Sequence, residues 1–279
     1  MSNHEILDAI KLSTLMRTQI PSNIENLISL GTNGENLLER LIENSTGEQR
    51  EEATIKANEI RLMAPITSPP KIVCLGLNYR DHIEEAGARI PDELVIFMKP
   101  RTSIIGPNEP VVKPSFVKQL DYEAELAIIM GKRGKNLPLS AAKDHIFGYT
   151  AFNDVSARDM QFHDGQWTRG KSFDTFAPIG PCITSAGQIG DPNNLHIYTK
   201  VNGEMRQSSS TKNMLFNVYE IVHKLSRVMT LEPCDIIATG TPSGVAAFTK
   251  PKPRFLEPGD KVEVGIENIG IIRNLIVEE

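Results

Sequence analysis

The sequence has few of the features that mark several large functional classes. Among its 279 residues are three cysteines, Cys74, Cys182 and Cys234, which lie far apart and form no CxxC pair. Such spacing favours buried, reduced thiols over a disulfide framework or a cysteine zinc site. No apolar stretch is long enough to span a bilayer, and the N-terminus lacks the continuous apolar core of a secretory signal. These absences predict a cytoplasmic protein with no membrane partner.

An excess of positive charge is also missing. The chain has 30 Lys and Arg against 35 Asp and Glu, a formal net charge of −5 at pH 7. Its basic residues are scattered and do not alternate with aromatic residues, so no nucleic-acid partner is expected. With 40% hydrophobic and 23% charged residues, the composition is that of an ordinary globular protein.

The chain changes character near a cluster of prolines after residue 65. Residues 1–65 are rich in Asn, Ser, Glu and Leu, and the apolar spacing within Leu37–Ile42 predicts an amphipathic helix. Ser45 and Glu48 have the spacing of a capping box, which predicts the start of another helix. We therefore expect a helical N-terminal extension over 1–65 and a catalytic domain over 66–279.

From Lys71 onward the pattern is mostly that of β-strands. Asn202-Gly203 and the segment 268–270 are typical hairpin turns, because their residues tolerate positive φ. One amphipathic helix is predicted between Met214 and Met229 from apolar residues at spacings of three and four. Strands and helices do not alternate regularly, which disfavours a doubly wound parallel sheet. The expected strands are Ile72–Leu75, Leu94–Met98, Ala124–Met130, Ile146–Phe152, His196–Val201, Ile236–Thr239, Lys261–Ile266 and Ile271–Val277.

Three carboxylates are the most informative residues in the chain. Glu123 and Glu125 are two residues apart in an apolar run, so on a strand they point to the same face. Such like charges repel unless a cation or a proton lies between them; the alternative for the pair alone is a solvated strand face. Asp154 ends a second apolar run and adds a third carboxylate. Without a nearby Cys or His, this set favours Mg²⁺ or Mn²⁺ over zinc.

The three carboxylates leave room for a substrate and call for a compensating cation. Mg²⁺ takes six ligands, and three monodentate carboxylates leave three positions for a chelating substrate and a water. Three carboxylates and one dication carry a net charge of about −1, so a nearby cation is expected. Lys171 in the segment TRGKSFD is the candidate.

A histidine–glutamate pair is the next candidate feature. His82 and Glu85 are three residues apart, so a helical turn places them on one face. A carboxylate beside an imidazole fixes its tautomer and raises its basicity. Gly76 and Gly87 flank the segment, which predicts a mobile lid. The alternative is a solvent-facing pair on a surface helix.

Two further segments supply candidate substrate contacts. The loop at 239–245, TGTPSGV, follows a predicted strand, and its backbone N–H groups and Thr241 Oγ could bind a carboxylate. The alternative is a simple turn, and the loop lacks the Gly-Lys-Ser/Thr of a Walker sequence. Arg158 and Gln161 follow Asp154 by four and seven residues, so a helix there places all three on one face. Arg158 could then grip a substrate carboxylate in bidentate fashion.

Seven motifs in order, GLNYRDH, DYEAEL, NDVSARDMQ, GKSFDTFAPIGP, VNGE, ATGTPSGV and LEPGDKVEV, resemble the fumarylacetoacetate hydrolase family. The resemblance covers about Lys71 to Asn274. It implies an α+β, β-rich fold, a mixed β-sandwich roll, and a homodimer. Many relatives carry a small β-rich module at the N-terminus, whereas residues 1–65 of this chain have a helical pattern.

The resemblance also implies roles for individual residues. It implies Mg²⁺ or Mn²⁺ and no organic cofactor, and it assigns to Lys171 a contact with the keto or enolate oxygen of the substrate. In compact relatives a His–Glu pair on a lid activates water. The implied metal ligands are Glu123, Glu125 and Asp154, the water-activating pair is His82 and Glu85, and the substrate contacts are Arg158, Gln161 and Thr241.

We expect hydrolytic cleavage of a C–C bond in a β-diketo acid of the acylpyruvate type, diketo sugar acids included. Its 2-keto acid end would chelate the metal, and the pyruvate enolate that leaves would be stabilised by Mg²⁺ and Lys171. The alternative is an oxaloacetate decarboxylase, or a keto-acid isomerase or tautomerase, because these reactions pass through the same enolate. A non-catalytic binding protein is disfavoured because the whole residue set is present. The acyl group is expected to contact Ala86–Asp92 and Phe162–Thr168.

Overall fold

The computed structural model describes residues 5–279, which divide after Leu62 into two compact units. Each unit has its own hydrophobic core, and the larger one contains all the candidate site residues. Among the described residues no helix is both long and apolar enough to cross a bilayer.

The smaller unit is mainly helical. Leu12, Leu41 and Ala53 form its buried core. Two short strands, one before its first helix and one after its last, pair in antiparallel fashion, a feature that the helical pattern did not predict. Its elements are β1 Glu5–Leu7, α1 Ala9–Leu15, α2 Ile24–Ser29, α3 Thr32–Glu43, α4 Gly47–Ala53 and β2 Thr54–Lys56.

The capping box of α4 lies one residue later than predicted. Thr46 accepts a hydrogen bond from Gln49 N, and the Gln49 side chain accepts one from Thr46 N. The prediction of Ser45 and Glu48 was wrong because the Ser45 hydroxyl donates to Ile42 O at 2.6 Å. Ser45 therefore closes the end of α3 and cannot cap the next helix.

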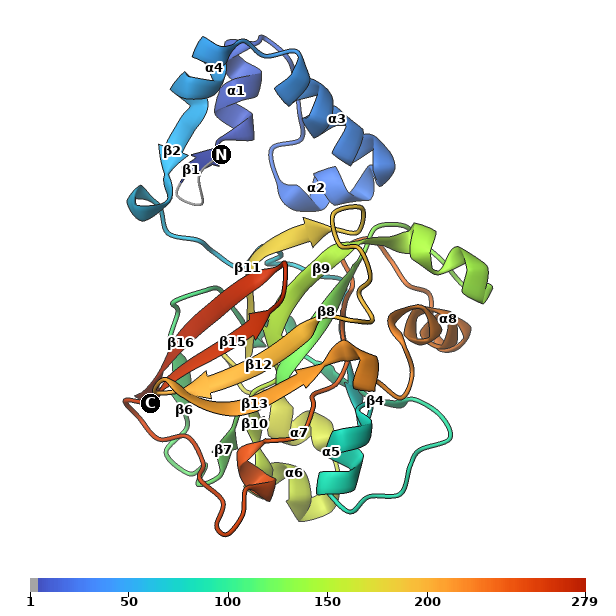
Figure 1. The fold of residues 1–279 in the computed structure, drawn as a ribbon, viewed down its shortest axis with the longest axis vertical. Helices are drawn as coiled ribbons and strands as arrows, with labels where there is room; N and C mark the ends of the chain where they lie inside the picture. The colour runs from blue at the N-terminus through green and yellow to red at the C-terminus, as the bar shows by residue number, and fades with distance from the viewer. Residues whose placement is uncertain (1–4) are drawn as a thin grey trace. The chain divides into compact units, whose positions relative to one another are not determined.

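The larger unit consists of two β-sheets packed face to face, with strands β8, β9 and β11 against β12, β15 and β16 (Figure 1). Both sheets are mixed, since β3–β14, β5–β11 and β6–β16 are parallel pairs in otherwise antiparallel ladders. The predicted α+β sandwich is thus confirmed.

In the seven-stranded sheet the order is β4 Val95–Lys99, β3 Ile72–Gly76, β14 Ile236–Ala238, β8 Ala124–Met130, β9 Ile146–Asn153, β11 Ala177–Ser185 and β5 Ile104–Ile105. In the five-stranded sheet it is β13 Glu204–Ser210, β12 His196–Val201, β15 Lys261–Ile266, β16 Gly270–Glu278 and β6 Val111–Lys113. A separate pair joins β7 Leu120–Asp121 to β10 Ser156–Ala157.

The predicted strands all occur, with ends that shift by a residue or two, but the long strands β11 and β13 were missed, as were the short strands β5, β6, β7 and β10. The segment of β11 contains Pro178 and Pro181, and that of β13 is almost entirely polar, so neither has the apolar alternation of a typical strand. The predicted hairpin at Asn202-Gly203 joins β12 to β13, with φ of 52° and 83° at its two residues.

Four α-helices belong to the larger unit. The longest, α8, starts after Asn217, which forms a capping box with Glu220. The helix predicted from Met214 begins four residues later than expected, because Asn78 binds the backbone of Leu215 and Phe216 in a non-helical path. The α-helices are α5 Arg80–Glu85, α6 Arg158–Asp164, α7 Trp167–Lys171 and α8 Val218–Val228. Short 3-10 helices cover Ala57–Glu59, Arg101–Ser103, Leu139–Ala141, Lys143–His145, Thr211–Asn213 and Ala246–Phe248.

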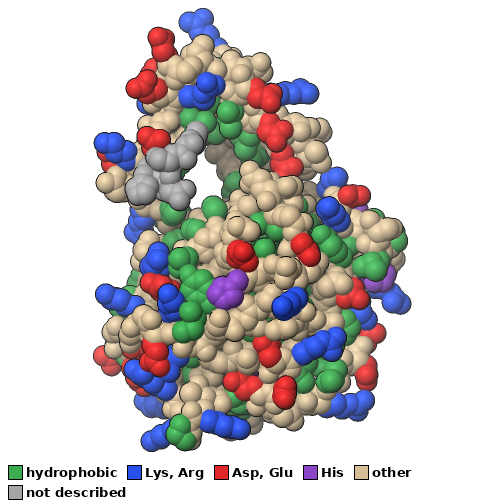
Figure 2. Space-filling view, in the orientation of Figure 1, with side chains coloured by type: hydrophobic (Ala, Val, Ile, Leu, Met, Phe, Trp, Pro, Cys, Tyr) green, Lys and Arg blue, Asp and Glu red, His purple; other side chains and the backbone are tan. Residues whose placement is uncertain are grey.

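On the face shown in Figure 2, basic and acidic side chains are interspersed. Neither sign forms a continuous patch in this view, which agrees with the nearly balanced composition.

Candidate active site

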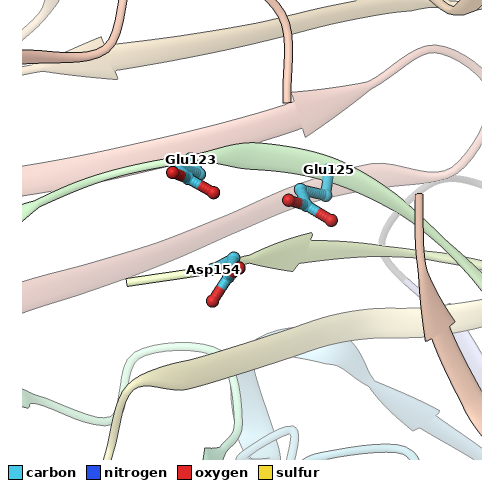
Figure 3. A group of neighbouring side chains, drawn as sticks. All are labelled: Glu123, Glu125 and Asp154. Carbon is cyan, nitrogen blue, oxygen red and sulfur yellow. The ribbon is translucent and has the colours of Figure 1, made fainter. Parts of the chain in front are cut away.

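The three predicted carboxylates meet where β8 and β9 pair. Ala124 of β8 lies opposite Asn153 of β9, and Asp154 N donates to Glu123 O at 2.9 Å. This register places Glu123 and Glu125 on the side that faces Asp154, as Figure 3 shows. One oxygen from each carboxylate lies within 4.8 Å of the others, and all three residues are buried.

The electrostatics of the two glutamates differ. Burial opposes ionisation of Glu123, but the charges of Lys171 and Arg158 lower its pKa to about 2. For Glu125, burial and then the charges of Asp154 and Glu123 raise the pKa well above its ordinary value.

The environment of Glu125 fits a bound cation. Its Oε2 accepts a hydrogen bond from Gly240 N at 2.9 Å, while its buried Oε1 has no hydrogen-bond partner among residues 5–279. A buried carboxylate oxygen without a partner is costly unless a cation or a proton occupies the space beside it. The three carboxylates could therefore hold a divalent metal ion.

Two lysines, rather than the single predicted one, neutralise the carboxylates. Lys171 Nζ lies 2.7 Å from both Glu123 Oε2 and Asp154 Oδ2. Burial opposes the charged amine, but Asp154 and Glu123 raise the pKa of Lys171, so it remains an ammonium. Lys99 at the end of β4 lies 2.6 Å from Asp154 Oδ1 and was not predicted. In the sequence, Lys99 could have been identified as a lysine at the end of an apolar strand segment.

The three guanidinium nitrogens of Arg158 all lie close to side chains of the protein, so no pair of them is free to bind a substrate carboxylate. Its Nε donates to Asp121 Oδ2 at 2.8 Å, its Nη1 donates to Gln161 Oε1 at 2.8 Å, and its Nη2 lies 2.7 Å from Glu123 Oε1. Asp121 also accepts from the backbone N–H groups of Tyr122, Ala246 and Ala247, and no motif or spacing in the sequence identified it as a site residue. In this arrangement Arg158 supports the carboxylates, and its predicted grip on a substrate would require new hydrogen bonds.

The His82–Glu85 pair forms on α5 as the spacing predicts. His82 Nδ1 lies 3.5 Å from Glu85 Oε2, and the imidazole packs against Phe248 with ring centroids 5.7 Å apart. Both Glu85 oxygens lie 3.0 Å from Gly244 N, so the pair is bound to the loop after β14.

The Thr241 hydroxyl is engaged within the protein. Its Oγ1 donates to Ala124 O at 2.9 Å and accepts from Gln207 Nε2 at 2.9 Å. The predicted contact between this hydroxyl and a substrate carboxylate would therefore have to replace an existing bond. Gln207 was not identified from the sequence.

Six of the nine predicted site residues line one pocket with about 60 Å³ of internal space, whereas Glu85, Glu125 and Asp154 do not. His82, Gln161 and Lys171 lie on its polar side, and aromatic residues from β4, α6, α7 and the loop after β14 form an aromatic wall. Gly76 lets the Trp167 ring pack closely, because a Cβ at this position would lie 1.9 Å from the ring. Close packing therefore accounts for a glycine here, and no hinge is needed to explain it. The lining also includes Leu75, Leu77, Ala86, Phe97, Glu123, Arg158, Phe162, Thr241 and Phe248.

Comparison with known proteins identifies the family of this chain. Residues 71–277 match the family described as the C-terminal part of fumarylacetoacetate (FAA) hydrolase. The chain belongs to the fumarylacetoacetate hydrolase family. It is 43% identical over 224 residues to the mitochondrial oxaloacetate tautomerase Fahd2a of Rattus norvegicus, which covers 80% of this chain and 71% of the relative.

Solved structures of this fumarylacetoacetate hydrolase family show the same fold. A 2-hydroxyhepta-2,4-diene-1,7-dioate isomerase from Mycobacterium marinum has a TM-score of 0.71 and 42% identity, with 81% of each chain covered. A fumarylacetoacetate hydrolase from Exiguobacterium antarcticum has a TM-score of 0.74 and 43% identity, with 82% of this chain and 83% of that one covered. The names of these similar proteins include a tautomerase, an isomerase and a hydrolase.

Proposed function

We propose that this protein is a divalent-metal-dependent enzyme that interconverts the keto and enol forms of a 2-oxo dicarboxylic acid such as oxaloacetate. The observation that carries the proposal is the buried triad of Glu123, Glu125 and Asp154, in which one Glu125 oxygen has no partner. The similarity to the rat oxaloacetate tautomerase supports the choice of reaction. The hydrolysis predicted from the sequence thereby becomes the second candidate.

The charge balance of the pocket suits an anionic substrate. Asp121, Glu123, Glu125 and Asp154 are compensated by Lys99, Arg158 and Lys171, which leaves one carboxylate in excess. A divalent cation held by the triad would reverse this sign and stabilise negative charge on the oxygens of a 2-oxo acid. Mg²⁺ and Mn²⁺ both prefer such oxygen ligands.

Lys171 would stabilise the enolate from the protein side. Its ammonium is fixed between Glu123 and Asp154 at 2.7 Å from each, so it needs no reorganisation when charge develops nearby. Donors fixed in this way stabilise the transition state more than mobile water does. We assign to Lys171 the contact with the C2 oxygen of the substrate.

His82 would move the proton. In tautomerisation the proton at C3 leaves, a C2–C3 double bond forms and the C2 oxygen gains a proton, so no water is consumed. Glu85 faces His82 Nδ1 at 3.5 Å, which leaves Nε2 as the nitrogen available to the substrate. A neutral imidazole oriented by a carboxylate is an efficient general base near neutral pH.

Hydrolysis of an acylpyruvate is the second candidate, because the same pair could activate water. The His82–Glu85 geometry and the similarity to the Exiguobacterium hydrolase favour it. Decarboxylation of oxaloacetate forms the same enolate and needs no water. The three reactions differ in their products: tautomerisation releases no pyruvate, whereas the other two do.

The test follows the conversion of enol-oxaloacetate by ultraviolet absorbance and, in parallel, pyruvate release from oxaloacetate and from an acylpyruvate. Each assay is run with Mg²⁺, with Mn²⁺ and with EDTA. We expect metal-dependent conversion of the enol that far exceeds pyruvate release. Pyruvate release from the acylpyruvate at a higher kcat/KM would establish hydrolysis instead.

A matched pair of variants tests the base. His82→Gln should lower kcat by about 100-fold, since general bases contribute about 10²–10⁴. His196→Gln, at the exposed first residue of β12, should retain the wild-type kcat. Equal rates for both variants would remove His82 from the mechanism.

A further inference from the structure

Gln207 is a buried side chain of β13 that uses all of its hydrogen-bonding groups beside the site. It is 1% exposed. Its Oε1 accepts from Ala124 N at 3.0 Å and from Thr199 Oγ1 at 2.7 Å. Its Nε2 donates to Thr241 Oγ1 at 2.9 Å and to Pro242 O at 2.8 Å. A glutamine amide has two donor hydrogens and an oxygen with two acceptor sites, so its capacity is filled.

The bonds at Ala124 lie between the first two candidate metal ligands. Ala124 N donates to Gln207, and Ala124 O accepts from Thr241 Oγ1 at 2.9 Å. The neighbouring strand β14 cannot take these bonds, because its last paired residue is Ala238, opposite Ala127. Two side chains therefore satisfy the backbone that joins Glu123 to Glu125.

The same glutamine also fixes the loop from Gly240 to Gly244. Gly240 N donates to Glu125 Oε2 at 2.9 Å, and Gly244 N lies 3.0 Å from both Glu85 oxygens. Gln207 Nε2 binds the loop between these ends, at Thr241 and Pro242. A Cβ at Gly244 would lie 2.2 Å from Arg206 O, so β13 also contacts the loop directly.

We propose that Gln207 is a positioning residue that holds the Glu123–Glu125 backbone and the Gly240–Gly244 loop as one unit. The metal ligands and the His82–Glu85 pair then keep their mutual geometry. This inference rests on the proposed metal site. It adds that the affinity for the metal depends on a side chain that contributes no ligand atom, because supporting hydrogen bonds fix the orientation of the ligands.

The main test compares two buried amides. Gln207→Met keeps the length of the side chain and removes its hydrogen bonds; Asn274→Leu does the same in β16, where Asn274 Nδ2 donates to Gly106 O and Glu109 O. Both variants should lose thermal stability. Only Gln207→Met should raise the Kd for Mn²⁺, measured by calorimetry without substrate, by about 10-fold or more.

A second set of variants isolates the bond to Thr241. Thr241→Val should raise the Kd for Mn²⁺, whereas Thr241→Ser keeps the hydroxyl and should restore the wild-type Kd. Because the two residues share partners, the effects of Gln207→Met and Thr241→Val should be clearly less than additive in the double variant. If Gln207→Met does not fold, the single variants Thr241→Val and Thr241→Ser still test the proposal.

The outcomes separate the inference from the function on which it rests. Wild-type Mn²⁺ affinity in Gln207→Met, or in Thr241→Val if the first does not fold, would overturn the positioning role and leave the metal site intact. An equal rise of Kd in Asn274→Leu would also overturn it, since general destabilisation would then explain the effect. If the wild-type protein binds no Mn²⁺, both the proposed metal site and the positioning role of Gln207 are refuted.

Discussion

The polar side of the pocket and its aromatic wall are built in different ways. Each charged group on the polar side has partners at defined distances, as in the 2.7 Å contacts of Lys171 with Glu123 and Asp154. The wall is held by packing: Trp167 meets Phe97 edge to face with centroids 5.8 Å apart. The wall consists of Phe97, Phe162, Trp167 and Phe248.

The two regions meet at Phe97, whose ring centroid lies 5.0 Å from Lys171 Nζ. On the polar side, hydrogen bonds and ion pairs hold charged groups where an enolate would form. In the aromatic wall, packing of the rings determines the shape of the pocket and involves no hydrogen bonds to the substrate. We therefore expect substitutions on the polar side to reduce kcat for every substrate. Substitutions in the wall should change KM, and by different amounts for different substrates.

The largest effect is expected from Asp154→Asn. The change removes one carboxylate of the triad and the ion pairs with Lys99 and Lys171, so kcat/KM should fall by about 1000-fold or more. Mn²⁺ binding measured by calorimetry should be lost in parallel. The loss should be the same for enol-oxaloacetate and for an acylpyruvate.

Asp235→Asn is the matched control, because Asp235 is a buried aspartate that pairs with Lys71 at 2.6 Å outside the pocket. It should lower the free energy of unfolding by about 1–3 kcal/mol and leave kcat/KM unchanged. Retention of Mn²⁺ binding by Asp154→Asn would contradict its assignment as a ligand.

The polar side could be predicted in part because some of its geometry is local in sequence. Glu123 and Glu125 share a face through the two-residue repeat of a strand, and His82 meets Glu85 within one helical turn. Lys99, by contrast, reaches Asp154 from 55 residues away. Its position depends on how the strands of the sheet are ordered, which the spacing of residues within one segment does not reveal.

Lys99→Met should have an intermediate effect. It removes one of two lysines from Asp154 and leaves Lys171 in place, so kcat should fall by about 10- to 100-fold and the protein should be destabilised by about 3 kcal/mol. Lys113→Met is the control, since Lys113 is also buried at the end of a strand and binds Leu256 O and Glu257. A wild-type kcat in Lys99→Met would show that Lys171 alone suffices for the site.

The aromatic wall could be predicted only as segments of sequence. Residues 86–92 and 162–168 were expected to contact the distal part of the substrate, and Ala86, Phe162 and Trp167 do line the pocket. Phe97 and Phe248 were not identified, since an aromatic residue in a strand or a loop is more often part of the core. No spacing rule distinguishes a ring that lines a pocket from one that is buried.

Gly76→Ala should have the smallest effect and the most selective one. The added Cβ would lie 1.9 Å from the Trp167 ring, so the ring must move into or away from the pocket. One methyl group changes the fit of a pocket by about 1–3 kcal/mol, so KM should change about 10-fold and kcat by less. The ratio of KM values for oxaloacetate and for a bulkier acylpyruvate should therefore shift.

Gly265→Ala is the matched control, because its Cβ would lie 2.3 Å from the Tyr198 ring outside the pocket, and this variant should leave that ratio unchanged. A uniform fall in kcat for all substrates in Gly76→Ala would show that the wall also positions Lys171, through Phe97, and that the two regions do not act separately.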